Sequence, residues 1–174
     1  RINSDRPFKY YLDLYNGVLP DARTRGCTRM LKIKPFERFI GDDQVVSYVG
    51  IRADEPYRTG YISTKGNIHA VYPFVENNIR KADVFKILDD AGLGVPSYYQ
   101  WRSRSGCFFC FYQSKLEWIK LYETHPELYK RAMEYEFHNC KNIKKGHFGW
   151  RADISLKELI KPENIKQVKE HLNG

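Results

Sequence analysis

The stretch Val45-Val46-Ser47-Tyr48-Val49-Gly50-Ile51 decides the fold of this 174-residue chain, because it carries the clearest strand signal in the sequence. Its β-branched and aromatic residues favour an extended backbone. Its nearly continuous apolar character is typical of a parallel strand that is covered on both faces. We therefore predict a strand over 45–51, within a parallel sheet.

Residues 68–72 are a second strand candidate, which ends at Pro73. Helices are expected where apolar residues recur every three or four positions or where a typical helix start is present. Pro35 is expected to kink the helix over 28–40. This order of elements predicts an α/β fold with helices added at its C-terminal end. The expected helices cover 7–15, 28–40, 80–91, 114–123, 126–137, 155–160 and 162–172.

The cysteines form the most informative chemical pattern. Cys107 and Cys110 have the CxxC spacing that lets two thiolates bind one metal ion or one cluster. Cys27 can complete such a site only if the fold brings it there, and Cys140, close to His138, is a candidate for the remaining ligand. The spacing predicts a zinc or [4Fe-4S] site and does not separate the two, because both accept thiolates.

Two other interpretations of the cysteines stay open. A CxxC can be a redox dithiol, although such a pair normally opens a helix directly after a strand, whereas this one follows an Arg/Ser/Gly-rich loop. Free cysteines also pack as small hydrophobic residues without any chemical role.

Charged residues follow the first predicted strand directly, in Arg52-Ala53-Asp54-Glu55-Pro56-Tyr57-Arg58. Ligands of open parallel sheets bind outside the carboxyl ends of the strands. Arg52 and Arg58 are therefore candidates to bind phosphate or sulfate oxygens. The alternative is a surface turn that is held by local salt bridges.

The formal net charge of +8 favours nucleotides, phosphate or nucleic acid as partners. Five of the basic residues surround Cys27, where they would lower thiol pKa values and offset the charge of a thiolate-ligated cluster. An exposed helix face is the alternative for this basic group. Its members are Arg23, Arg25, Arg29, Lys32 and Lys34.

Several classes of protein are excluded by the composition. No apolar run reaches the length of a membrane span, and no signal-peptide pattern opens the chain. Four cysteines in an otherwise ordinary composition do not suggest a disulfide scaffold. We expect a soluble, cytoplasmic protein without a membrane partner. The start at Arg1, without methionine, indicates the interior of a longer gene product.

Five motifs occur in an order that resembles the phosphoadenosine phosphosulfate reductase family of adenine-nucleotide α-hydrolases. The resemblance covers roughly residues 20 to 135 and implies a doubly wound α/β domain of the ATP-pyrophosphatase type. Residues 1–112 would be the C-terminal half of that domain, and 113–174 a helical extension. The motifs are Cys27 to Pro35, Gly50 to Glu55, Val71 to Phe74 with Lys81 to Val84, Gly92 to Pro96, and Ser105 to Cys110.

The resemblance also implies roles for individual residues. Cys27, Cys107 and Cys110 would hold the cluster, and Cys140 or His138 would supply the fourth ligand unless it stays open, because Gly26 occupies the position of a further family cysteine. Nucleotide or anion binding would fall to Arg52, Arg58, Arg29 and Lys32. Asp54 and Glu55 would orient the arginines or hold Mg²⁺. The family's Ser-Gly-Gly-Lys-Asp-Ser-like phosphate loop is absent from this sequence, so ATP and Mg²⁺ binding would require such a loop upstream.

The sulfonucleotide reductases of this family use a nucleophilic cysteine in a C-terminal segment, and here no cysteine follows Cys140. The better match is the group of bacterial and phage homologues that includes the ATP-pyrophosphatase component of DNA phosphorothioation systems. This implies a sulfur-transfer enzyme that works with an adenine nucleotide, DNA and other subunits of a modification or defence system. The alternatives are a sulfonucleotide reductase that uses an external thiol, and a non-enzymatic, zinc-stapled nucleic-acid-binding or regulatory module.

Overall fold

The structure is a computed structural model that describes residues 4–60, 65–137 and 149–171. The chain divides into two compact units. Unit 1 combines Arg1–Phe36 with Gln100–Gly174, and unit 2 is Glu37–Tyr99. Cys27, Cys107 and Cys110 therefore belong to unit 1, whereas the charged segment 52–58 belongs to unit 2. The predicted division of the chain after residue 112 follows from the family resemblance, and it stays a prediction.

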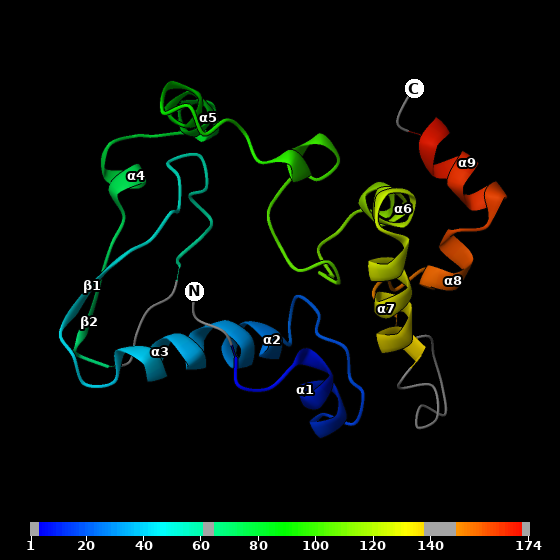
Figure 1. Cartoon of the computed structure of the whole chain (residues 1–174), viewed down its shortest axis with the longest axis horizontal. Helices are drawn as coiled ribbons and strands as arrows, with labels where there is room; N and C mark the ends of the chain where they lie inside the picture. Colours follow the sequence, from blue (N-terminus) through cyan, green and yellow to red (C-terminus); the bar gives the residue numbers. More distant parts are fainter. Residues whose placement is uncertain (1–3, 61–64, 138–148, 172–174) are drawn as a thin grey trace. The chain divides into compact units, whose positions relative to one another are not determined.

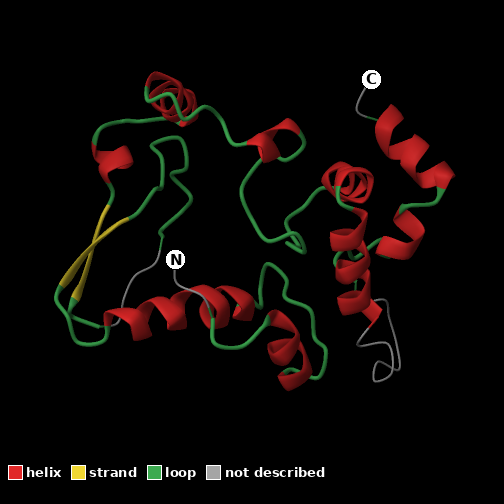
Figure 2. Cartoon of the chain, in the orientation of Figure 1, coloured by secondary structure: helices red, strands yellow, loops and turns green. Residues whose placement is uncertain are grey.

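Unit 2 is built around two parallel strands, β1 (Val45–Tyr48) and β2 (Ile68–Val71), which Figure 2 shows side by side in yellow. Val45 pairs with Ile68, and Tyr48 pairs with Val71. The parallel pairing confirms the mixed α/β character that the sequence predicts. The strands are followed by α4 (Pro73–Glu76), α5 (Lys81–Asp90) and a 3₁₀ turn, η2 (Ser97–Gln100).

The prediction for the first strand is wrong in two respects. The strand ends at Tyr48 instead of residue 51, and its burial alternates along the chain. Val46 and Tyr48 are 55% and 77% exposed, so the described part of the chain covers one face of β1 and leaves the other open. An apolar run shows only that the residues of a strand suit burial. Whether each face of the strand is buried depends on which other elements pack against it.

Unit 1 holds most of the buried apolar residues. Its helices are α1 (Phe8–Leu14), α2 (Gly26–Thr28), the π-helical η1 (Arg29–Ile33), α6 (Lys115–Thr124), α7 (Pro126–Phe137), α8 (Leu156–Leu159) and α9 (Pro162–Glu170) (Figure 1). Helix α6 packs against α7, α8 and α9. The core contains Phe8, Leu12, Leu19, Trp118, Ile119, Leu121, Tyr129, Ala132, Trp150, Leu156 and Leu159. Every helix in the described ranges is too short or too polar to cross a bilayer.

The predicted helix over 28–40 is present, and its irregularity lies upstream of Pro35. The π-helical η1 runs directly into α3 (Lys34–Ile40), which places Pro35 in the first turn of α3. Just before the proline, the backbone N–H of Lys34 donates to the carbonyl of Arg29 five residues back, so the helix continues through a wider turn into Pro35, which has no N–H to donate. The wider π-turn just before it is one of the recognised sites of helix distortion.

A buried carboxylate fastens the segment around Trp150 to α7. Glu136 is 2% exposed and accepts hydrogen bonds from the backbone N–H groups of Trp150 (3.1 Å) and Leu156 (2.8 Å). The indole of Trp150 donates to the carbonyl of Ala132 at 2.8 Å. Tyr129 donates to the carbonyl of Leu156 at 2.7 Å, and burial raises the pKa of its hydroxyl. Polar groups of the core therefore fix how α8 follows α7.

Glu136→Ala is expected to reduce the free energy of unfolding of unit 1 by about 3 kcal/mol, because it leaves two buried N–H donors without a partner. Urea titration followed by tryptophan fluorescence measures this loss, since Trp101, Trp118 and Trp150 all lie in unit 1. Glu134→Ala, at an exposed position of the same helix, is the control and should change stability little. Equal effects of the two substitutions would contradict a structural role of the Glu136 carboxylate.

Candidate functional site

The CxxC motif forms a tight turn in unit 1. The backbone N–H of Cys110 donates to the carbonyl of Cys107 at 3.1 Å, and the N–H of Gln113 donates to the carbonyl of Cys110 at 3.0 Å. The side chain of Gln113 donates to the carbonyl of Phe108 at 2.8 Å. Three carbonyls of the turn are thus hydrogen-bonded within the turn or just after it, which defines its backbone conformation.

Arg102 holds the turn from its N-terminal side. Its buried guanidinium donates to the carbonyls of Gly106 (3.1 Å) and Cys107 (3.2 Å). Nothing in the sequence of this loop, with its arginines, serines and glycines, marks Arg102 as the buried one. Arg102 therefore connects the start of the loop to the first cysteine of the motif.

Glu117 of α6 connects the same loop to the helix that follows it. One carboxylate oxygen accepts hydrogen bonds from the N–H (2.7 Å) and the hydroxyl (2.8 Å) of Ser103, and the other accepts from the N–H of Ser114 at 2.8 Å. Ser114 in return caps the helix by accepting from the N–H of Glu117. Burial alone would raise the pKa of Glu117, but these hydrogen bonds outweigh it and the pKa is lowered. Glu117 thus stays ionised while it anchors the loop.

The fold brings three thiols into one neighbourhood. Cys27, Cys107 and Cys110 are free and half-buried. Burial raises the pKa of Cys107, Cys110 and Cys27 raise it further, and Lys32 and Arg102 lower it in part. The expectation that the basic group would lower thiol pKa values is therefore wrong for Cys107, because the loss of hydration outweighs the nearby cations.

The prediction of a metal-binding site requires correction. Among residues 4–60, 65–137 and 149–171, no group of three or more histidine, cysteine, aspartate or glutamate side chains is arranged to hold a metal ion. Thiolate ligands must converge to about 2.3 Å from one zinc ion, whereas the electrostatic influence of one thiol on another extends much further. Cys140 and His138, the candidates for the fourth ligand, lie outside the described residues. The predicted zinc or iron-sulfur site is therefore contradicted for the described residues.

The two phenylalanines of the CxxC turn pack against the core. Phe109 stacks on Phe8 with ring centroids 4.3 Å apart, and it also meets Tyr135 and Trp150. Phe108 lies edge-on to Phe109 and beneath the guanidinium of Arg131. These contacts are those of packing residues, and they leave these two rings a structural role instead of the base-stacking role that a nucleic-acid-binding module would need.

A pocket of about 360 Å³ adjoins Cys27. Its walls are mainly apolar and come from α1, the segment after it and the start of α2. The apolar lining includes Tyr11, Tyr15 and Leu19, and Thr24 and Cys27 also line the pocket. Cys27 therefore has an apolar pocket on one side and belongs to the thiol neighbourhood as well.

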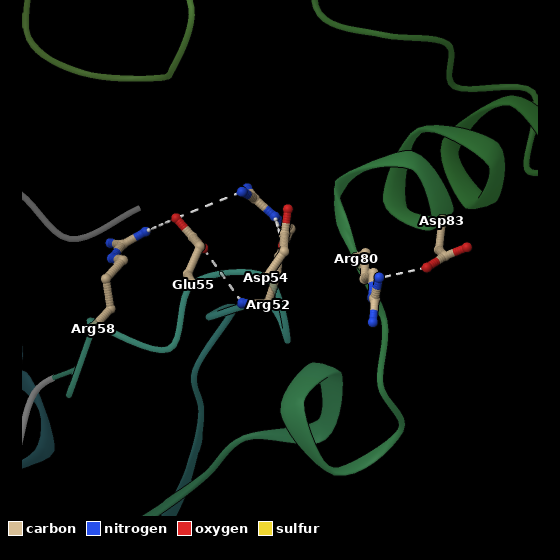
Figure 3. A network of polar contacts seen from close by, with 6 residues as sticks. All are labelled: Arg52, Asp54, Glu55, Arg58, Arg80 and Asp83. Carbon is tan, nitrogen blue, oxygen red and sulfur yellow. Dashed lines mark hydrogen bonds and ion pairs between the residues drawn. The ribbon is translucent and has the colours of Figure 1, made fainter.

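In unit 2 the predicted charged segment forms a compact ion-pair network around Glu55 (Figure 3). Arg58 donates to one oxygen of Glu55 at 2.8 Å, and the backbone N–H of Arg52 donates to the other at 3.3 Å. The side chain of Arg52 donates from Nε to Asp54 at 2.8 Å and lies 3.6 Å from Glu55. These local salt bridges are the ones that the surface-turn interpretation expects. The same network also orients the guanidinium groups of Arg52 and Arg58 beyond the end of β1.

The environment of this network defines its electrostatics. Burial would raise the pKa of Glu55, but the hydrogen bonds from Arg58 and from the backbone of Arg52 outweigh it, so the pKa is lowered. The hydrogen bond from Arg52 likewise lowers the pKa of Asp54, with a smaller contribution from the backbone of Lys81 at the start of α5. Both acids are therefore ionised at neutral pH, and both pair with Arg52.

Arg29 and Lys32, the other predicted anion-binding residues, lie exposed on η1 of unit 1. The predicted nucleotide site is thus divided between the two units, and the four residues of the segment 52–58 are the ones that the structure brings into direct contact. Comparisons with family models, with curated proteins and with solved structures give no match for this chain.

Arg102→Lys is expected to expose Cys107 and Cys110 while it keeps the positive charge. A lysine cannot bridge two carbonyls with a planar fork, and the loss of one charge-assisted hydrogen bond should raise the labelling rate of both thiols about tenfold. Iodoacetamide labelling followed by peptide mass spectrometry measures the rate for each cysteine. Arg104→Lys is the control, since Arg104 is exposed and lies over the ring of Tyr112. Unchanged labelling in Arg102→Lys would contradict the anchoring role.

The lowered pKa of Glu55 predicts how stability depends on pH. Its stabilisation is present above the ordinary glutamate value near 4.5 and is lost as the pH falls through the lower pKa of the folded state. Glu55→Gln should therefore reduce the fall in stability between about pH 5 and about pH 3, as measured by urea titration with circular dichroism. A profile for Glu55→Gln that runs parallel to the wild type would show that Glu55 titrates alike in the folded and unfolded chains.

Proposed function

We propose that unit 2 binds the phosphate groups of an adenine nucleotide through Arg52 and Arg58. The observation that carries this proposal is the position of the two arginines in one ordered loop just beyond the carboxyl end of a parallel strand, where α/β sheets bind their ligands. The side chains of Arg52 and Arg58 are 25% and 53% exposed. Each guanidinium thus has exposed surface for an anion while the carboxylates hold its orientation.

The surroundings of the loop suit a nucleotide. The backbone N–H of Ala53 donates to the carbonyl of Ile79 at 3.0 Å, which ties the loop to the segment before α5. At the start of α5, the ammonium of Lys81 lies 5.5 Å from the ring of Phe85 and 5.9 Å from that of Tyr99. Arginines, a lysine and aromatic rings are groups that bind phosphates and a nucleobase.

The motif order leads us to extend the proposal to the reaction. The chain would be part of a doubly wound nucleotide domain of the phosphoadenosine phosphosulfate reductase type, which requires Mg²⁺ and ATP. ATP would activate an acceptor oxygen as its adenylate with release of pyrophosphate, and the outer sulfur of a persulfide from a sulfur-donor protein would displace AMP. A second thiol would then cleave the S–S bond, which releases the thiolated product and leaves a disulfide. The thiols near Cys107 support this sulfur chemistry, and the net charge of +8 supports DNA and the subunits of a DNA modification or defence system as partners.

The nucleotide proposal predicts that the chain binds AMP and adenylyl sulfate more tightly than adenosine, because only the first two offer an anion to the arginines. Arg58→Ala should weaken AMP binding about tenfold or more, as expected for one charge-assisted hydrogen bond, and should leave adenosine binding unchanged. NMR titration of the whole chain measures both affinities.

Arg6→Ala, which removes the same charge from unit 1, is the matched control and should bind AMP as the wild type does. Equal losses in Arg6→Ala and Arg58→Ala would indicate a general effect of charge, and no preference for AMP over adenosine would overturn the proposal. Sulfite release from adenylyl sulfate in the presence of a thiol would instead support a sulfonucleotide reductase.

A further inference from the structure

We infer that Cys107 and Cys110 form a reversible disulfide by exchange with low-molecular-weight disulfides of the glutathione type. The inference rests on the backbone of the CxxC turn and is independent of nucleotide binding by unit 2. It gives the motif a chemical activity that needs no metal.

The turn geometry places the two cysteines at the right separation. The hydrogen bond from the N–H of Cys110 to the carbonyl of Cys107, at 3.1 Å, is the bond that closes a four-residue β-turn. The first and last residues of a β-turn have Cα atoms less than about 7 Å apart, and disulfides join Cα atoms about 4.4–6.8 Å apart. Bond formation therefore requires side-chain rotation and little movement of the backbone.

The surrounding contacts hold this turn in place. Arg102 binds the carbonyls of Gly106 and Cys107, and Gln113 binds those of Phe108 and Cys110. The rings of Phe108 and Phe109, between the cysteines, pack against the core of unit 1. A turn that is already held in shape loses little further conformational freedom when its ends are joined, which favours the bridged form over mixed disulfides.

The exchange takes place in two steps at the two thiols. Both residues are half-buried, so neither is enclosed in the core. The thiolate of one cysteine attacks the external disulfide, which forms a mixed disulfide and releases one external thiolate. The second cysteine thiolate then attacks the protein sulfur of the mixed disulfide and releases the other external thiolate. The two protons of the cysteines pass to the released thiolates, the protein loses two electrons, and the external disulfide gains them.

The test equilibrates the full chain with a series of ratios of reduced to oxidised glutathione, traps the remaining thiols with iodoacetamide, and maps the products by peptide mass spectrometry. The expected product is a bridge between Cys107 and Cys110, with two glutathione molecules released for each chain oxidised. Cys107→Ser and Cys110→Ser should each stop at the mixed disulfide, which accumulates at least about tenfold over the wild type. Cys27→Ser is the matched control and should form the bridge as the wild type does.

A comparison with the unfolded chain separates the contribution of the fold from that of the short spacing. The ratio of bridged to dithiol form, at one glutathione ratio, should be higher in native buffer than in concentrated urea, because only the folded chain holds the turn. Circular dichroism confirms that each variant is folded. An equal or lower ratio in native buffer, a bridge to Cys27 or Cys140, or resistance of both thiols to oxidised glutathione would overturn the inference.

Discussion

Buried glutamates that accept hydrogen bonds from backbone N–H groups are the constraint on which the loops of this protein depend. Glu117 binds the N–H groups of Ser103 and Ser114, and Glu136 binds those of Trp150 and Leu156. In unit 2 Glu55 binds the N–H of Arg52. A buried N–H group without a partner is costly, so a carboxylate that satisfies two of them determines where two points of the chain must lie.

The same principle explains why the two candidate sites differ in character. In unit 1 the carboxylate of Glu117 accepts hydrogen bonds from Ser103, at the start of the loop before the cysteines. Arg102 donates to the carbonyls of Gly106 and Cys107 in the same loop. The hydrogen bonds of these two charged side chains stabilise the backbone of the loop. In unit 2 Glu55 binds the side chain of Arg58 as well as the backbone of Arg52, so the carboxylate orients the groups that would meet a ligand. Two acids and two arginines balance in charge, and selectivity for an anion must come from the orientation of the guanidinium groups.

The cysteines show that proximity and coordination are separate properties. Cys27 influences the ionisation of Cys107 although the two are distant in sequence, so the fold places these two thiols near each other. Their arrangement does not make a metal-binding group among the described residues. What the CxxC spacing does impose is a tight turn, in which the backbone N–H of Cys110 donates to the carbonyl of Cys107.

The sequence by itself determined the local elements. Helix α7 has the predicted bounds, α5 lies within one residue of them at each end, and α9 begins at Pro162 as expected. Each depends on apolar spacing and end residues that are close in the chain. The short helix α4 was missed because Pro73 indicates both the end of a strand and the start of a helix, and the two signals cannot be distinguished locally.

Only the tertiary structure decided which side chains are buried and what they contact. The open face of β1, the hydrogen bonds of the buried Glu136 and the raised pKa of Cys107 all depend on elements that are distant in sequence. Residue types show which groups can bind a phosphate, a thiol or a backbone N–H. Burial and mutual distance decide which of these interactions form, because both set the cost of removing each group from water.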